Sequence, residues 1–290
     1  MIPLTKLKKD VLFNTELTKV VDVLKGVAAS RFHILERQLK SFDDYFKAAE
    51  GFLELIDWTQ VAHPFVRART NTVGAILVTS NAGFLGGLNT QVLSIGMREA
   101  GGADGVYTVI GERGASALRG TRLSCTFFPG IDDAARLSLA LSVRDHVVQQ
   151  VLAGTCGRLV VIYPRPVSFS VQEVAADALL PSGAWVPSES RTAMGRLMLW
   201  ESSPEEVAEY VVAQWLGHRL DQIFALSRLA ELSARVVHLE GSYQELGRLG
   251  KKLKHEYHRA RHEVIDRSMR EIFAAQLLYG KAHEDDHTAS

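Results

Sequence analysis

The sequence predicts an α/β protein with a long antiparallel coiled coil, in which N- and C-terminal helices flank a central, mainly parallel sheet with helices on its faces. Two observations support this fold class. Apolar residues recur at steps of three and four over both ends of the chain, and short apolar runs alternate with helical patterns between them. We expect an N-terminal helix within 1–62, an α/β domain at 68–200, a C-terminal helix at 203–280 and a polar tail at 281–290.

The N-terminal helix is expected to begin after Pro3, since the first turn of a helix tolerates proline. Its apolar residues have an average spacing of about 3.5, which is the coiled-coil repeat. They are Leu4, Leu7, Val11, Leu17, Val21, Leu24, Ala28, Phe32, Leu35, Leu39, Phe42, Phe46, Ala49, Leu53 and Ile56. Gly26 is the one position expected to weaken this helix, because glycine has a low helix propensity. Pro64 disfavours a helical His63, so the helix should end near residue 60.

The C-terminal helix has a clear start signal at Ser203-Pro204-Glu205-Glu206: a capping hydroxyl, then proline, then acids in the first turn. No proline follows Pro204. The apolar seam expected beyond it comprises Leu229, Leu232, Val236, Leu239, Tyr243, Leu246, Leu249, Leu253 and Tyr257. A seam of this length needs a partner, and the N-terminal helix can supply it because the central domain returns the chain antiparallel. The alternative is two helices that lie on separate cores.

Between the two helices, apolar runs of strand length alternate with helical patterns. Strands are expected at 73–79, 106–110, 125–128 and 158–163, with a fifth at 167–174. Helices are expected at about 89–100, near 115–118, and from a cap at Asp132 to about Leu152; Pro164 should end the fourth strand. The region 181–200 is loop-rich. Alternation of strand and helix implies a mainly parallel sheet.

Composition limits the classes of function. The 290 residues are 47% apolar and carry a formal net charge of zero, which argues against a bulk nucleic-acid or membrane-surface binder. No apolar run reaches the roughly 20 residues of a membrane span, and the first residues do not resemble a signal peptide. Cys125 and Cys156 have no metal or redox spacing, so we expect a reduced, intracellular protein without a cofactor.

The sharpest local motif is the glycine-rich segment Thr79–Asn89, which follows the first expected strand. Such a turn can cradle a phosphate, but this one has no lysine and matches neither common phosphate-binding pattern. We interpret Gly83, Gly86 and Gly87 as a structural turn. His255, His258 and His262 share one helical stripe among cations, which favours a solvated flank over a metal site. No catalytic centre is predicted.

Charge is concentrated near one end of the expected rod. Residues 248–270 contain eight Lys or Arg and three Asp or Glu, and the N-terminal helix is basic as well. Antiparallel pairing would bring both stretches to the same end. They indicate either ordinary solvated faces or a rod end held by an acidic partner.

Three blocks resemble the γ subunit of F-type ATP synthases over essentially the whole chain. Lys25-Gly-Val-Ala-Ala29 is similar to a family block that ends Lys-Met-Val-Ala-Ala. Ser80–Asn89 is similar to Ser-Asp-Arg-Gly-Leu-Cys-Gly-Gly-Leu-Asn. Ala234-Arg-Val, Tyr257-His-Arg-Ala-Arg261, Ile265 and Glu271-Ile272 match the family at a long, ungapped spacing. Gly26, Asn81-Ala82 and Gly241–Glu245 depart from it, which suggests a divergent branch; the sodium-translocating type is one candidate.

The resemblance implies a non-catalytic rotor shaft that couples ion flow to ATP synthesis or hydrolysis. Its implied partners are a ring of α and β subunits, the ε subunit and the c-ring, and its implied place is peripheral, at the cytoplasmic face of the inner membrane. Lys25, Arg31, Arg259 and Arg261 are the expected polar contacts to the ring. Ile272, Phe273, Leu277 and Leu278 are the expected apolar bearing. Direct membrane insertion and nucleic-acid binding are not expected.

Two other functions fit the residues alone. One is a Rossmann-like nucleotide-binding enzyme whose helices form an oligomerisation arm. The other is a coiled-coil scaffold that homodimerises through its terminal helices. The first predicts that the isolated chain binds nucleotide, and the second predicts a stable dimer.

Overall fold

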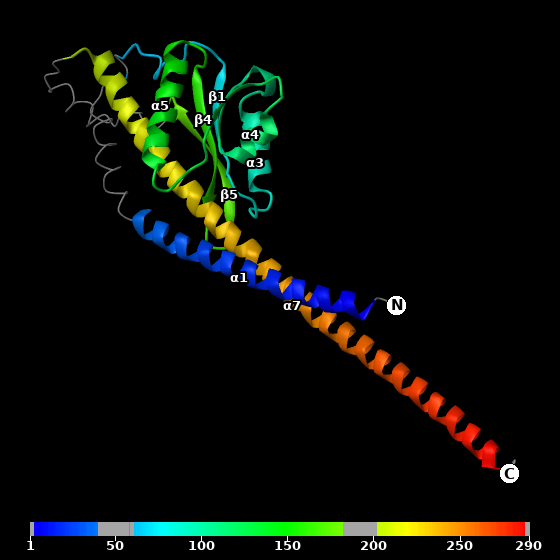
Figure 1. Cartoon of the computed structure of the whole chain (residues 1–290). Helices are drawn as coiled ribbons and strands as arrows, with labels where there is room; N and C mark the ends of the chain where they lie inside the picture. Colours follow the sequence, from blue (N-terminus) through cyan, green and yellow to red (C-terminus); the bar gives the residue numbers. More distant parts are fainter. Residues whose placement is uncertain (1–2, 40–57, 59–60, 182–201, 288–290) are drawn as a thin grey trace. The chain divides into compact units, whose positions relative to one another are not determined.

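The computed structural model describes residues 3–39, 58, 61–181 and 202–287, with side chains as far as residue 275 (Figure 1). The chain divides into two compact units. Unit 1 comprises Met1–Lys25 and Leu239–Ser290, and unit 2 comprises Gly26–His238. Within the described residues, no helix combines the length and the apolar character needed to cross a bilayer.

Two long helices form the ends of the chain. Helix α1 spans Leu4–Leu39, and apart from Trp58, which lies in a turn, the rest of the predicted N-terminal helix lies outside the described residues. Helix α7 spans Pro204–His287 and begins at the predicted signal, where the Ser203 hydroxyl accepts the Glu206 amide at 3.2 Å. Helix α7 ends later than predicted: it continues from residue 280 to His287, through the first residues of the polar tail. No proline or glycine between residues 281 and 287 interrupts the helical hydrogen bonds.

The central sheet lies in unit 2 and has the strand order β3-β2-β1-β4-β5. Its strands are β1 (Val73–Val78), β2 (Val106–Ile110), β3 (Ser124–Phe128), β4 (Arg158–Pro166) and β5 (Gln172–Leu180). The first four are parallel, and β5 pairs antiparallel with β4. The mainly parallel sheet predicted from the alternation is therefore confirmed.

Helices cover both faces of this sheet. Helices α3 (Leu88–Glu99) and α4 (Glu112–Leu118) lie on one face, α5 (Arg136–Leu152) lies on the other, and a short 3-10 turn, η1, spans Gly102–Asp104. Adjacent residues of β1 divide between the two cores: Ile76 packs with α5 and the N-terminal half of α7, whereas Leu77 packs with α3. Gly96 of α3 lies so close to Leu77 that a β-carbon there would overlap its side chain.

Three boundaries differ from the prediction. Helix α5 begins at Arg136, not at Asp132, whose carboxylate instead accepts the Ala134 amide in the preceding turn. Strand β4 continues through Pro164, because the pairing with β1 ends at Ile162 and the missing amide of proline interrupts no bond on that side. The fifth strand begins at Gln172 and runs to Leu180, so the alternating residues 167–171 precede it. The loop expected at 181–200 lies almost entirely outside the described residues.

Candidate functional site

Helices α1 and α7 contact each other within each unit, and the contacts run antiparallel. In unit 2, Phe32 and Leu35 of α1 form a buried cluster with Leu229 and Leu232 of α7. In unit 1, Asn14 contacts the backbone of α7 at Leu246, while Lys25 contacts Glu240. As the residue number rises along α1, it falls along α7. The antiparallel pairing of the terminal helices predicted from the sequence is confirmed.

The seam in unit 1 is more polar than predicted. Leu17 and Leu24 of α1 and Leu249 of α7 are exposed, although all three were expected in the seam. Asn14 is buried in their place, and Thr18, Lys25 and Gly250 are half-buried. A repeat of seven that runs through Leu7, Asn14, Val21, Ala28 and Leu35 identifies the true buried stripe. That repeat is the signal in the sequence that could have identified Asn14.

The Lys25 ammonium is surrounded by two carboxylates and an aromatic ring from its own unit. Its ammonium nitrogen is 3.0 Å from Glu240 Oε2 and 3.1 Å from Asp22 Oδ1, and it lies 4.4 Å from the centre of the Tyr243 ring. The hydrogen bond to Glu240, then that to Asp22, raises the pKa of Lys25. Because these partners already satisfy its charge, Lys25 differs from the other three predicted ring contacts.

Arg31, Arg259 and Arg261 are exposed. Arg31 lies on α1 in unit 2, whereas Arg259 and Arg261 lie on α7 in unit 1. Residues 261–275 of α7, which we call the tip segment, expose every side chain. They continue past the N-terminal end of α1 (Figure 1).

The tip segment carries large apolar side chains in water. Ile272 is 55% exposed and Phe273 is 59% exposed; Leu277 and Leu278 fall within α7, beyond the last side chain that the structure describes. Val264, Ile265 and Met269 extend the exposed apolar surface toward Arg261. Among the described residues no other element covers this run of apolar side chains, and such a surface is typical of one that another protein contacts.

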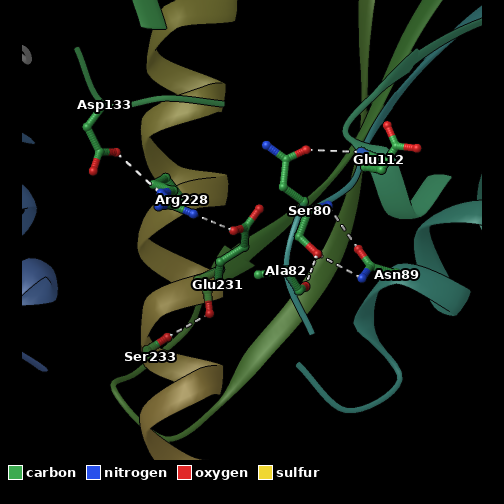
Figure 2. A network of polar contacts seen from close by, with 10 residues as sticks. Ser80, Ala82, Asn89, Glu112, Asp133, Arg228, Glu231 and Ser233 are labelled. Carbon is green, nitrogen blue, oxygen red and sulfur yellow. Dashed lines mark hydrogen bonds and ion pairs between the residues drawn. The ribbon is translucent and has the colours of Figure 1, made fainter. Parts of the chain in front are cut away.

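The glycine-rich turn after β1 binds its own polar groups (Figure 2). The Ser80 amide donates to Asn89 Oδ1 at 3.1 Å, the Asn89 amide donates to the Ser80 hydroxyl at 2.9 Å, and that hydroxyl donates to the Ala82 carbonyl at 2.8 Å. Leu85 and Leu88 pack under Ala234 of α7. The geometry is that of a packed strand-to-helix connection, with the Ser80 amide turned toward Asn89 and not toward a ligand.

The three glycines of this turn meet different surroundings. Gly86 has a φ of +59°, and a β-carbon there would overlap the His238 ring. A β-carbon at Gly83 would lie 3.1 Å from Arg113 Nη2. At Gly87 the nearest atom would be Gln91 Nε2 at 3.9 Å, so that position has room for a side chain. Gly86 is therefore the glycine that the turn requires both for its backbone conformation and for close packing.

A buried polar network on α7 was missed by sequence reasoning. Arg228 donates to Glu231 Oε2 at 2.9 Å, and its Nε lies 3.4 Å from Asp133 Oδ1 (Figure 2). Burial raises the pKa of Glu231, and Arg228 opposes that shift. Burial also lowers the pKa of Arg235. The spacing of three between Arg228 and Glu231 was the available signal, but only the fold shows that the pair is buried.

The histidine stripe remains a solvated surface. His255, His258 and His262 are all exposed. Across the described part of the chain, no group of histidine, cysteine or acidic side chains is arranged to hold a metal ion. Burial raises the pKa of the Cys125 thiol and raises that of Cys156 to about 11, which disfavours the reactive thiolate form of both side chains.

Comparison with known proteins agrees with this arrangement. A family model described as ATP synthase matches residues 6–276, nearly the whole chain. The chain belongs to the ATP synthase γ family. Its relatives include the ATP synthase gamma chain of Chlorobaculum parvum, 27% identical over 72% of this chain and 74% of that protein. The gamma chain of Stenotrophomonas maltophilia is 26% identical over 88% of this chain and 91% of that protein.

Solved structures show the same fold. A chain of the mitochondrial ATP synthase of Euglena gracilis, solved with OSCP, F1 and the c-ring, aligns with a TM-score of 0.69 at 16% identity and covers 94% of this γ chain and 93% of itself. A chain from the central stalk and c-ring of the Tetrahymena thermophila enzyme aligns with a TM-score of 0.60 at 18% identity, covering 77% and 99%. Membership of the γ family argues against the Rossmann enzyme and the scaffold, and it assigns the chain to a non-catalytic subunit. The sodium-translocating type stays a prediction.

Proposed function

We propose that the tip segment of this γ chain turns inside a ring of α and β subunits and couples the rotation of the central stalk to ATP synthesis or hydrolysis. The observation that carries the proposal is the exposure of apolar side chains along a single uncovered helix. Water disfavours such a surface by about 25 cal/mol for each Å² of apolar area. A surrounding sleeve of protein would remove that cost while leaving the helix free to turn.

The polar part of the contact is expected at Arg259 and Arg261. Both are exposed and lie just before the apolar residues of the tip segment, in a stretch of α7 with an excess of basic residues. An exposed guanidinium can pair with a carboxylate through two parallel hydrogen bonds, which suits an acidic loop on the ring. Arg31 is exposed as well and remains a proposed contact.

We propose that Lys25 holds α1 and α7 together and does not contact the ring. Its ammonium is held by Glu240 and Asp22, so a contact to the ring would first require these bonds to break. We assign Lys25 to the cohesion of the two helices and keep Arg259, Arg261 and Arg31 for the ring. The bearing comprises Ile272 and Phe273 and extends to Leu277 and Leu278.

The proposed coupling mechanism depends on the asymmetry of the two-helix shaft. A shaft of two unequal helices presents a different face to each of three identical β subunits. A partner can shift a conformational equilibrium only by binding two states with different affinity. Differential contact therefore biases each nucleotide site toward a different affinity, and rotation moves every site through binding, synthesis and release.

The remaining partners concern the central domain. We propose that the α/β domain of unit 2 contacts the ε subunit and the c-ring, and that the chain is held peripherally at the cytoplasmic face of the inner membrane through them. Affinity purification of the native chain tests the assembly. Recovery of α, β, ε and c subunits is expected, and recovery of a homodimer alone would contradict it.

The ring contact is tested by Arg261→Ala in the reconstituted complex. We expect ATP synthesis to fall several-fold while the thermal stability of the isolated chain stays unchanged, because Arg261 is exposed. Arg248→Ala is the matched control, since Arg248 is an exposed arginine of α7 that pairs locally with Glu245 at 2.7 Å. Equal rates in the two variants would remove Arg261 from the contact.

A further inference from the structure

Asn14 is the polar side chain that α1 buries against α7 in unit 1. It is only 6% exposed, and its Nδ2 donates to the carbonyl oxygen of Leu246 at 3.1 Å. Its Oδ1 is buried and has no hydrogen-bond partner among the described residues. Burying an amide in a seam between helices costs free energy unless its bonds are made, so a different alignment of the helices would leave Asn14 worse placed.

The bond to Leu246 depends on a missing side chain. In an α-helix the carbonyl of residue 246 already accepts the amide of residue 250, and the side chain at 250 normally shields that oxygen. Position 250 is glycine, and a β-carbon there would lie 2.7 Å from Asn14 Nδ2. Gly250 has no positive φ, so it serves space and not backbone conformation. A glycine inside a helix is destabilising relative to alanine, so its presence at position 250 needs a compensating reason.

The sequence around Gly250 penalises the neighbouring alignments. Sliding α1 by one heptad preserves a repeat of 3.5 and is the natural error of a coiled coil. It would bring position 243 or 257 to Asn14 in place of Gly250, and both positions are tyrosine. The positions seven residues on either side of Glu240 are Ser233 and Gly247, so the same slip would also deprive Lys25 of the Glu240 carboxylate and leave it only Asp22 of its own helix.

We propose that Asn14 is a positioning residue that sets the axial register of α1 against α7. Its side chain fits the space left by the missing side chain of Gly250. The Lys25–Glu240 ion pair is a second constraint on the same register. A polar side chain in a seam specifies alignment at the expense of stability. The register decides how much of α7 extends uncovered beyond α1. A slip of one heptad would change that length by about 10 Å, at about 1.5 Å per residue.

The test measures the register directly in the full-length chain. Spin labels are placed on exposed positions of the two helices through Leu17→Cys and Arg248→Cys, in a Cys125→Ala background. Cys156 is retained, because it is fully buried and its thiol pKa is about 11. Pulsed electron paramagnetic resonance then gives the distribution of distances between the labels. One narrow distance is expected for the parent chain.

Asn14→Ala and Asn14→Asp are expected to add a second distance population of at least about a tenth of the molecules, because neither side chain can donate to Leu246. Gly250→Ala should do the same and also lower the unfolding temperature, since its methyl group displaces the Asn14 amide. The double variant Asn14→Ala/Gly250→Ala should recover the unfolding temperature of Asn14→Ala but keep both distances. That combination separates loss of register from loss of packing.

Gly247→Ala is the control for Gly250→Ala. Gly247 lies on the same helix with open space around its α-carbon, so alanine should raise stability and leave a single distance. Circular dichroism verifies that each variant keeps its helices. A single native distance in Asn14→Ala, or a Gly250→Ala variant that behaves like Gly247→Ala, would overturn the proposal.

Discussion

Arg136, at the start of α5, donates two hydrogen bonds to Asp221 of α7. Its Nε lies 2.8 Å from Oδ1 and its Nη2 lies 3.4 Å from Oδ2, and the two side chains are 11% and 6% exposed. The pair connects the sheet-covering helix to the long helix within unit 2. The carboxylate of Asp221 therefore exchanges water for a bidentate arginine partner.

Removing one member of this pair should be costly. We expect Asp221→Ala to lower the free energy of unfolding by about 3–5 kcal/mol, because Arg136 would keep a buried charge after losing the Asp221 carboxylate. Urea denaturation followed by circular dichroism measures the change. Glu173→Ala is the control: it breaks the exposed pair with Arg165 and should cost less than about 1 kcal/mol. Equal costs for the two variants would show that burial of the pair is unimportant.

Stability should decline in mildly acidic solution. Burial lowers the pKa of His63 from 6.5, although Glu209, 3.3 Å away, acts in the opposite direction, and burial lowers that of His146 as well. The unfolded chain then binds protons that the folded chain refuses, so the stability present above about pH 6.5 is lost as the pH falls. Thermal unfolding between pH 5 and 8 measures this slope. His63→Gln should flatten it, and an unchanged slope in that variant would contradict the assignment to His63.

Gly86 and Gly87 are adjacent glycines, and we expect alanine to be tolerated at Gly87 but not at Gly86. Gly86→Ala forces a β-carbon into a left-handed backbone and against His238, and should destabilise the chain by about 1–2 kcal/mol or more. Gly87→Ala, with room around it and a φ of −88°, should be nearly neutral. Thermal denaturation distinguishes the two. If both alanines cost the same, neither the φ of Gly86 nor its contact with His238 is the constraint.

Phe84 holds a left-handed backbone, with a φ of +64°, while its ring is 60% exposed. Such a conformation costs a non-glycine residue about 1–2 kcal/mol, and the exposed ring recovers little of that cost by burial. We expect Phe84→Gly to raise the unfolding temperature by a few degrees. Phe84→Ala, which keeps the β-carbon, should not raise it.

Periodicity predicted most of the architecture but not the face on which each helix is buried. Helix α1 carries two heptad stripes, one through Leu7, Asn14 and Val21 and the other through Leu17 and Leu24. The prediction took the apolar members of both stripes and left out Asn14, because its side chain is polar. The structure buries the first stripe, where Gly250 of α7 leaves room for Asn14 and Glu240 of α7 pairs with the neighbouring Lys25. Complementarity between distant segments is not visible in either segment alone.

The β strands were easier to predict because each is a short apolar run between turn signals, and β2 matches its prediction at both ends. The end of β4 was harder. Pro164 stops a strand only where its amide would be needed, and that depends on which neighbour lies alongside it. The Arg228–Glu231 pair likewise has an ordinary helical spacing, and only the fold makes it a buried contact.

The uncovered tip segment also bears on the life of a newly made copy. Met269, Ile272 and Phe273 are exposed to water, and exposed apolar side chains on one helix are what chaperones and quality-control proteases recognise. An unassembled copy should therefore be degraded faster than an assembled one. The abundance of the subunit would then follow the supply of its partners rather than its own rate of synthesis.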